Sequence, residues 1–168
     1  MAFQSRKLVL IAHIATSIGF MGAVATFLAL ALVGLTTHDS EVVRSAYMAL
    51  STVTYGAILP LAFASLVIGI VQSLVTPWGL FRHYWVVVKL WLTIVSVVVL
   101  MLQLQSVDYL AHVARASGHF EELLALRIAL VAHAAGGLMV LLVATGLSVY
   151  KPLGMTRYGR SRAANAGL

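Results

Sequence analysis

Four long apolar blocks constrain the fold of this chain more than any other feature. They cover residues about 8–35, 46–76, 84–107 and 128–150. A helix needs about 20 apolar residues to cross the hydrocarbon core of a bilayer, and each block is long enough. Inside the hydrocarbon a backbone must satisfy its own polar groups, which favours helices over irregular chain. The sequence therefore predicts an all-α integral membrane protein, a four-helix bundle.

The composition supports a single transmembrane domain that covers residues 1–168. Hydrophobic residues make up 61% of the chain and charged residues only 10%, and the mean hydropathy is +1.00. A soluble domain carries about a quarter of its residues as charges. The chain has no cysteine, so disulfides, thiolate metal ligands and cysteine nucleophiles are excluded.

The charged residues divide between the two sides of the predicted bundle. One side holds Arg6, Lys7, Arg82, Lys89, Lys151, Arg157, Arg160 and Arg162. The other side holds all the acidic residues, Asp39, Glu41, Asp108, Glu121 and Glu122, with three arginines. Lysine and arginine accumulate on the cytoplasmic side of membrane proteins. We therefore expect cytoplasmic termini, a basic cytoplasmic tail at 151–168, and a location in the bacterial cytoplasmic (inner) membrane.

The net charge of +6 follows from this distribution. Basic residues next to a membrane are attracted to anionic lipid headgroups. The expected partner is the lipid bilayer, and nucleic acid is not expected.

Several residues inside the blocks have a structural interpretation. Gly19, Gly22, Gly136 and Gly137 are small enough to let helices approach closely. Pro60 is expected to kink the second helix. The aromatic residues near the block ends fit interfacial belts, with Trp78, Tyr84 and Trp85 on the inner side and Tyr47 and Tyr109 on the outer side.

Two ionisable residues fall at a similar depth in the inner leaflet. His13 lies six residues after Lys7, or about 9 Å along a helix, and Lys89 lies five residues after Tyr84. Ionisable groups inside membrane helices usually face the bundle interior and mark a site. His13 and Lys89 are therefore a candidate cofactor site in the inner leaflet.

Lys89 also begins a polar stripe along one face of its helix, which continues with Thr93, Ser96 and Gln103. The stripe indicates an interior face. Two alternatives to a site remain. Lys89 could direct its ammonium back to the headgroups, and Thr16 or Ser17 could hydrogen-bond the His13 imidazole.

His133 lies in the opposite leaflet, six residues after Arg127 and about 9 Å from the outer face. Its expected neighbours are Tyr55 and Gln103. No second histidine of the chain falls at this depth, which argues against a bis-histidine electron carrier unless a homodimer supplies a second His133. His133 is a further candidate cofactor ligand.

A candidate metal site lies on the outer side. Asp108 and His112 are four residues apart and would share one helical turn, with His119 and Glu122 further along. Carboxylate and imidazole groups suit zinc or another divalent ion. The alternative is a set of solvated loop charges, because the spacing matches no known ligand motif.

Two resemblances add to these observations. Residues 76–89, Thr-Pro-Trp-Gly-Leu-Phe-Arg-His-Tyr-Trp-Val-Val-Val-Lys, together with 148–152 and 158–159, resemble an uncharacterised family of small four-helix bacterial membrane proteins. His13 and the pattern Trp-x-x-x-Lys-Leu at 85–90 are more distantly similar to the four-helix membrane protoporphyrinogen oxidases and the copper-resistance D-type proteins. The second resemblance implies heme b near His13, with Lys89 beside it.

Three functions are open at this point. The favoured one is a non-catalytic subunit or assembly factor of a membrane complex, whose partners would be other membrane subunits or a second copy of the chain. The alternative is a heme-b-binding or porphyrin-handling redox protein with His13 as axial ligand. The third is a small transporter, although the inverted repeats that this function usually shows are not seen. Hydrolase and nucleotide-driven chemistry are not expected, because their motifs are missing.

Overall fold

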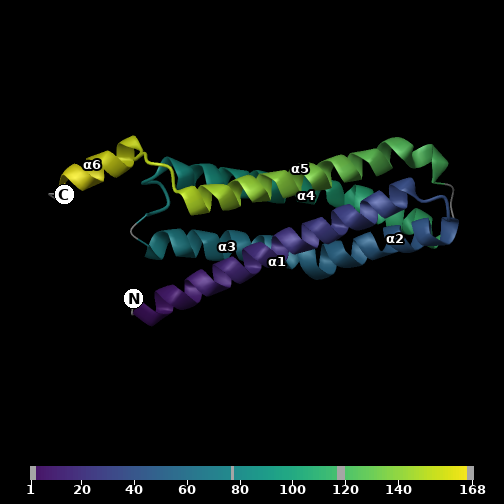
Figure 1. The fold of residues 1–168 in the computed structure, drawn as a ribbon, viewed down its shortest axis with the longest axis horizontal. Coiled ribbons are helices and arrows are strands. Elements are labelled where there is room, and N and C mark those ends of the chain that lie inside the picture. The colour runs from purple at the N-terminus through teal and green to yellow at the C-terminus, as the bar shows by residue number, and fades with distance from the viewer. Residues whose placement is uncertain (1–2, 77, 117–119, 166–168) are drawn as a thin grey trace.

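The computed structural model describes residues 3–76, 78–116 and 120–165, and it is helical nearly throughout (Figure 1). The elements in chain order are α1 (Phe3–Thr36), α2 (Ser40–Val53), the π-helical segment η1 (Thr54–Ile58), α3 (Leu59–Val75), α4 (Tyr84–Arg115), the 3-10 turn η2 (Glu121–Leu123), α5 (Leu124–Tyr150) and α6 (Arg157–Asn165).

Four helical spans in the described part of the chain are long and apolar enough to cross a membrane. They are α1, the continuous run Ser40–Val75, α4 and α5. This confirms the prediction of an all-helical protein with four helices that are long and apolar enough to span a membrane. The spans extend beyond the apolar blocks, and α4 continues to Arg115, because charged residues outside the hydrocarbon can continue a helix that is already formed.

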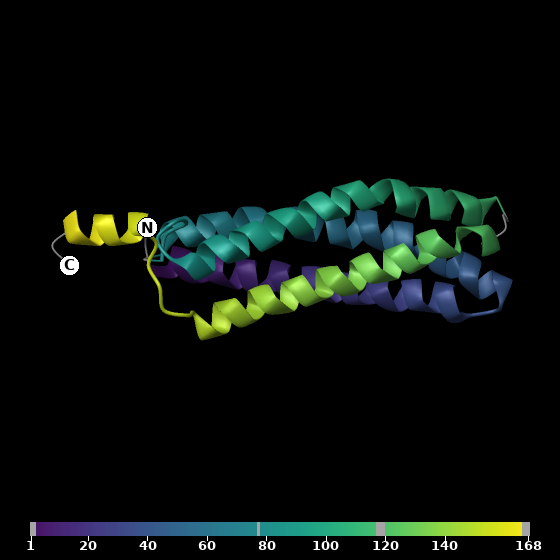
Figure 2. The same cartoon turned by 90° about the horizontal axis from the view of Figure 1, so that it is seen from above.

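The spans pack side by side along an elongated bundle (Figures 1 and 2). Both α1 and α4 contact the second span, and both also contact α5. The two described ends of the chain lie at the same end of the bundle, and α6 projects beyond that end. We call the half of the bundle with the two chain ends the terminal half, and the other the far half. A cytoplasmic position for the terminal end stays a prediction.

Local sequence explains how the second span begins and where it changes pitch. The Asp39 carboxylate caps α2 by accepting hydrogen bonds from the backbone N–H groups of Glu41 and Val42. Pro60 has no N–H group and disturbs the preceding turn. The π-helical segment η1 ends directly before Leu59, whose N–H donates to the Thr54 carbonyl. The disturbance expected from Pro60 therefore takes the form of a π-helical segment.

The far half contains most of the closely packed core. Its largest fully buried side chains come from three spans and are Tyr47, Leu50, Thr54, Leu110 and Leu130. The α1 helix adds one face with a spacing of three or four residues, formed by Phe20, Val24, Phe27 and Ala31. In the terminal half the described residues offer fewer buried positions, among them Ser65, Trp85 and Val86.

A buried arginine holds the far half together. Arg127 Nε donates to the Tyr47 hydroxyl at 2.8 Å, and Nη2 donates to the Gly34 carbonyl at 2.5 Å. Nη1 donates to the Phe120 carbonyl at 3.3 Å, and the Phe120 ring stacks on Tyr47. We call Gly34, Tyr47, Phe120 and Arg127 the Arg127 cluster. It places a cation at the C-terminal end of α1, where the helix dipole favours positive charge.

Two of the structural expectations from the sequence are wrong in part. Tyr47 is 1% exposed and belongs to the core, so it is not an interfacial anchor. A Cβ on Gly19 would contact Leu61 at 3.3 Å, as close helix packing requires, but a Cβ on Gly22, Gly136 or Gly137 would meet nothing within 4 Å. These three glycines do not mediate close packing within the described chain, because no other helix reaches them.

At the terminal end, the loop between α3 and α4 binds the segment that follows α5. The backbone N–H of Thr156 donates to the Arg82 carbonyl at 3.0 Å, and the Thr156 hydroxyl donates to the Phe81 carbonyl at 2.6 Å. Gly159 packs directly against the Arg82 backbone and leaves no room for a Cβ. We call residues 78–84 and 151–159 the clasp. It joins the two segments on which the first family resemblance rests.

Candidate functional site

His13 lies between α1 and α3 in the terminal half. Its Cε1 lies 3.0 Å from where a Cβ on Gly69 would stand, and its Nδ1 is buried without a hydrogen-bond partner. Thr16 donates to backbone carbonyls of its own helix, and Ser17 pairs with Ser65 at 3.0 Å. The expected hydrogen bond from Thr16 or Ser17 to the His13 imidazole is therefore wrong.

Lys89 lies near the depth of His13, but its ammonium points toward Trp85. Its Nζ lies 5.6 Å from the centre of the Trp85 ring, one helical turn closer to the terminal end. This is the direction that snorkelling predicts. Lys89 is close enough to His13 to act on it electrostatically, but no hydrogen bond joins the two side chains among the described contacts. The site between them stays a prediction.

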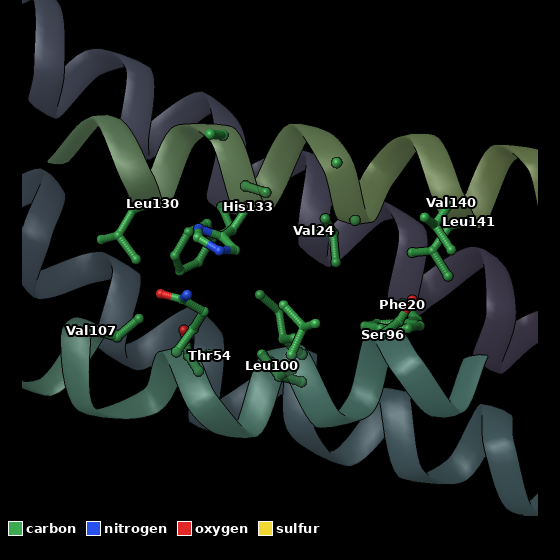
Figure 3. A pocket seen from close by; sticks show the side chains of 18 of the residues that line it. Phe20, Val24, Thr54, Ser96, Leu100, Val107, Leu130, His133, Val140 and Leu141 are labelled. Carbon is green, nitrogen blue, oxygen red and sulfur yellow. The ribbon is translucent and has the colours of Figure 1, made fainter. Parts of the chain in front are cut away.

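A cavity of about 390 Å³ lies elsewhere, between α4 and α5 with α1 and η1 behind it (Figure 3). Its walls are mainly apolar, and they include Phe20, Phe27, Ile58, Leu100, Val107 and Leu141. None of its lining residues is charged. Val95 and Val99 of the wall are 47% and 36% exposed. In a bilayer these side chains face lipid, so the cavity opens sideways to the hydrocarbon.

Among the described residues that line the cavity, His133 is the one titratable side chain. Its Nδ1 lies 2.6 Å from the Ala129 carbonyl. A carbonyl oxygen only accepts hydrogen bonds, so Nδ1 carries the hydrogen and Nε2 of the neutral ring keeps a lone pair. Figure 3 shows His133 among the side chains between α5 and α4. The imidazole therefore offers Nε2 as an acceptor or as a metal ligand.

The other polar residues of the wall are Thr54, Ser96 and Gln103. The first two donate their hydroxyl hydrogens to carbonyls of their own helices, at 2.7 and 2.9 Å. The Gln103 amide makes no hydrogen bond with another described residue. Gln103 and His133 line the same cavity, and a direct contact between them stays a prediction. The expectation for Tyr55 is wrong, since its hydroxyl donates to the Asp108 carboxylate at 2.7 Å.

The predicted metal site on the far side is described only in part. Asp108 accepts the hydrogen bond from Tyr55, and His112 lies one turn further along α4. His119 lies outside the described residues. Among the residues that the structure does describe, no group of three or more histidine, aspartate or glutamate side chains could hold a metal ion.

Two features of the cavity were not predicted. Gly136 and Gly137 line it and leave it open, because no atom of another described segment lies within 4 Å of a Cβ built on either of them. The sequence did contain a signal, since His133, Gly136 and Gly137 are spaced to share one helix face. The π-helical segment η1 contributes Thr54 and Ile58 to the lining, and a π-helical turn is often found at functional sites.

Heme b fits neither candidate position well. At His13 the imidazole packs against Gly69, and a macrocycle would have to separate α1 from α3. At His133 the free Nε2 and the apolar walls suit an axial ligand and a ring, but the cavity has no cation to pair with heme propionates. The cavity is better suited to a neutral, largely apolar molecule with a few polar atoms.

No protein family, curated protein or solved structure matches this chain.

Proposed function

We propose that this protein is a membrane-embedded binding protein for a neutral, largely apolar molecule. The observation that carries the proposal is the lateral cavity of about 390 Å³, whose mainly apolar wall holds one imidazole, one amide and two hydroxyl groups that already donate to their own helices. Ligand pockets of small molecules have this size and this pattern of a few polar groups in apolar surroundings. The ligand would enter from the hydrocarbon between α4 and α5.

The test is to identify the small molecules that co-purify with the protein from its own membrane. We would purify it in mild detergent and analyse the organic extract by mass spectrometry, for the unmodified chain and for Gly137→Leu, which places a branched side chain inside the cavity. Gly146→Leu is the matched control, because Gly146 also lies on α5 with nothing within 4 Å but does not line the cavity.

We expect one apolar compound at about one molecule per chain in the unmodified protein and in the control. In Gly137→Leu it should fall at least about tenfold, because a tenfold loss corresponds to only about 1.4 kcal/mol. The same compounds in equal amounts in all three preparations would contradict the proposal.

A second candidate function is that of a non-catalytic subunit or assembly factor of a larger membrane complex. The clasp supports it, because backbone hydrogen bonds fix an ordered surface outside the bundle that exposes Trp78, Phe81 and Tyr158. Exposed aromatic residues are enriched at protein interfaces. Gly159→Leu should disturb the clasp and release the chain from such a complex in native electrophoresis of membrane extracts, whereas Gly146→Leu should not. A chain that migrates alone with its clasp intact would contradict this function.

We further propose that the terminal end faces the cytoplasm of a bacterial cell. Lysine and arginine gather at this end, and the acidic residues lie at the other. Because the chain has no cysteine, single cysteines placed at positions 39 and 160 can be labelled on intact cells with an impermeant reagent. Labelling at 39 alone is expected, and labelling at 160 alone would reverse the orientation.

A further inference from the structure

The polar groups of the cavity define the ligand more narrowly, on the premise that the proposed function holds. Thr54 and Ser96 have already donated their hydroxyl hydrogens to their own helices. Their oxygens can only accept further hydrogen bonds, so the free donor of the cavity lies with the Gln103 amide, and the His133 ring adds a nitrogen acceptor. Nε2 of the neutral His133 ring accepts one hydrogen, and the Gln103 amide can donate one. An acceptor and a donor in one cavity complement a hydroxyl group, which both donates and accepts.

His133 and Gln103 lie inside the hydrocarbon layer, where a ligand hydroxyl finds few other hydrogen-bond partners. His133 lies five residues, or about 8 Å, inside the apolar block 128–150, and Gln103 lies four residues, or about 6 Å, from the outer end of the block 84–107. Both positions fall inside a hydrocarbon core about 30 Å thick. A hydroxyl at this depth in lipid has no water to bind, and an unpaired polar group there is costly. The cavity therefore gives a buried hydroxyl partners that the surrounding lipid lacks.

The walls indicate what the hydroxyl is attached to. Phe20 and Phe27 line the cavity with branched aliphatic residues, and aromatic side chains pack favourably against a second ring. The absence of charged residues from the lining argues against a carboxylate, phosphate or ammonium group on the ligand.

We propose that the ligand is a lipophilic phenol or quinol. Its hydroxyl hydrogen is donated to Nε2 of His133, its hydroxyl oxygen accepts from the Gln103 amide, and its ring and apolar chain fill the space left by Gly136 and Gly137. The ligand enters sideways from the bilayer and therefore has to be soluble in lipid. Among lipid-soluble molecules, the site prefers those that carry a hydroxyl group.

The test compares two probes that differ only in this hydroxyl. One is a phenol with a para-nonyl chain and an ortho fluorine, and the other is its methyl ether. Each is added to the full-length protein in phosphatidylcholine nanodiscs, and binding is measured by fluorine NMR. One or two hydrogen bonds that the ether cannot complete should make the phenol bind about tenfold more tightly.

Three variants test whether Gln103 and His133 cause the tighter binding of the phenol. Gln103→Leu and His133→Phe should each bring the affinity for the phenol close to that for the ether. Gln105→Leu is the control for Gln103→Leu, because Gln105 is exposed on the same helix and does not line the cavity. If one of the first two variants does not fold, the other still tests the inference.

The failure of this inference can be told apart from the failure of the proposed function. Equal affinity for both probes, lost for both in Gly137→Leu, would overturn the hydroxyl inference and leave an apolar binding protein. A preference for the phenol that survives in both Gln103→Leu and His133→Phe would also overturn it. If neither probe binds the unmodified protein more than it binds Gly137→Leu, both the inference and the proposed function are wrong.

Discussion

The two halves of the bundle differ in how they bind the basic residues within their helices, of which Arg127 is buried and His13 and Lys89 are half-buried. In the far half, Arg127 donates to the Tyr47 hydroxyl and to backbone carbonyls from α1 and the α4–α5 connection, without a carboxylate. In the terminal half, Nδ1 of His13 has no partner and Lys89 reaches back to Trp85. A cation is tolerated at membrane depth when acceptors from several helices converge on it. The far half is therefore a fixed scaffold, and the cavity begins where its close packing ends.

The largest effect is expected from the centre of the far half. Arg127→Met leaves the Tyr47 hydroxyl and the Gly34 carbonyl without their donor, and we expect a loss of about 3 kcal/mol in the free energy of unfolding. Thermal unfolding in detergent, followed by circular dichroism, measures it. Arg115→Gln at the exposed end of α4 is the control and should change stability by less than about 0.5 kcal/mol. Equal stability of the two variants would mean that the Arg127 cluster does not hold the far half together.

A smaller effect is expected from a single methyl group. In Gly34→Ala the new Cβ would lie 2.8 Å from Tyr47 Cζ, so the Tyr47 ring must move and weaken its bond to Arg127. We expect a loss of about 1–3 kcal/mol, as for other overpacked core positions. Gly22→Ala places the same methyl group in open space and should be neutral or slightly stabilising. Chemical denaturation in mixed micelles compares the pair, and a larger loss in Gly22→Ala would reverse the expected order.

In the terminal half we expect almost no loss of stability. His13→Leu removes a buried nitrogen that has no partner and keeps an apolar side chain against Gly69, so stability should change by less than about 1 kcal/mol or rise. A loss above about 2 kcal/mol would mean that His13 has a partner in the native membrane.

An absorption spectrum of the same preparations tests the heme hypothesis. We expect no Soret band, whereas a band that disappears in His13→Leu would restore the site between His13 and Lys89.

The sequence predicted the spans well because long apolar blocks leave the chain few alternatives. It predicted the site less well for a physical reason. Depth along a helix follows from counting residues, and Gln103 and His133, which were expected at similar depth, do line one cavity. Direction around the helix depends on partners, so Tyr47 was assigned to the interface although Arg127 holds it in the core. The shared face of His133, Gly136 and Gly137 can be read from the sequence, but whether a gap opens beside it depends on how far apart α4 and α5 lie, which the spacing does not reveal.

The most direct test of the proposed binding function is a crystal structure of the unmodified protein grown in a lipidic phase. The account predicts density for a non-protein molecule between α4 and α5, with a polar atom within hydrogen-bond distance of Nε2 of His133, and no such density in Gly137→Leu. A cavity closed by direct contact of α4 with α5, or a bound molecule between His13 and Lys89 instead, would contradict it.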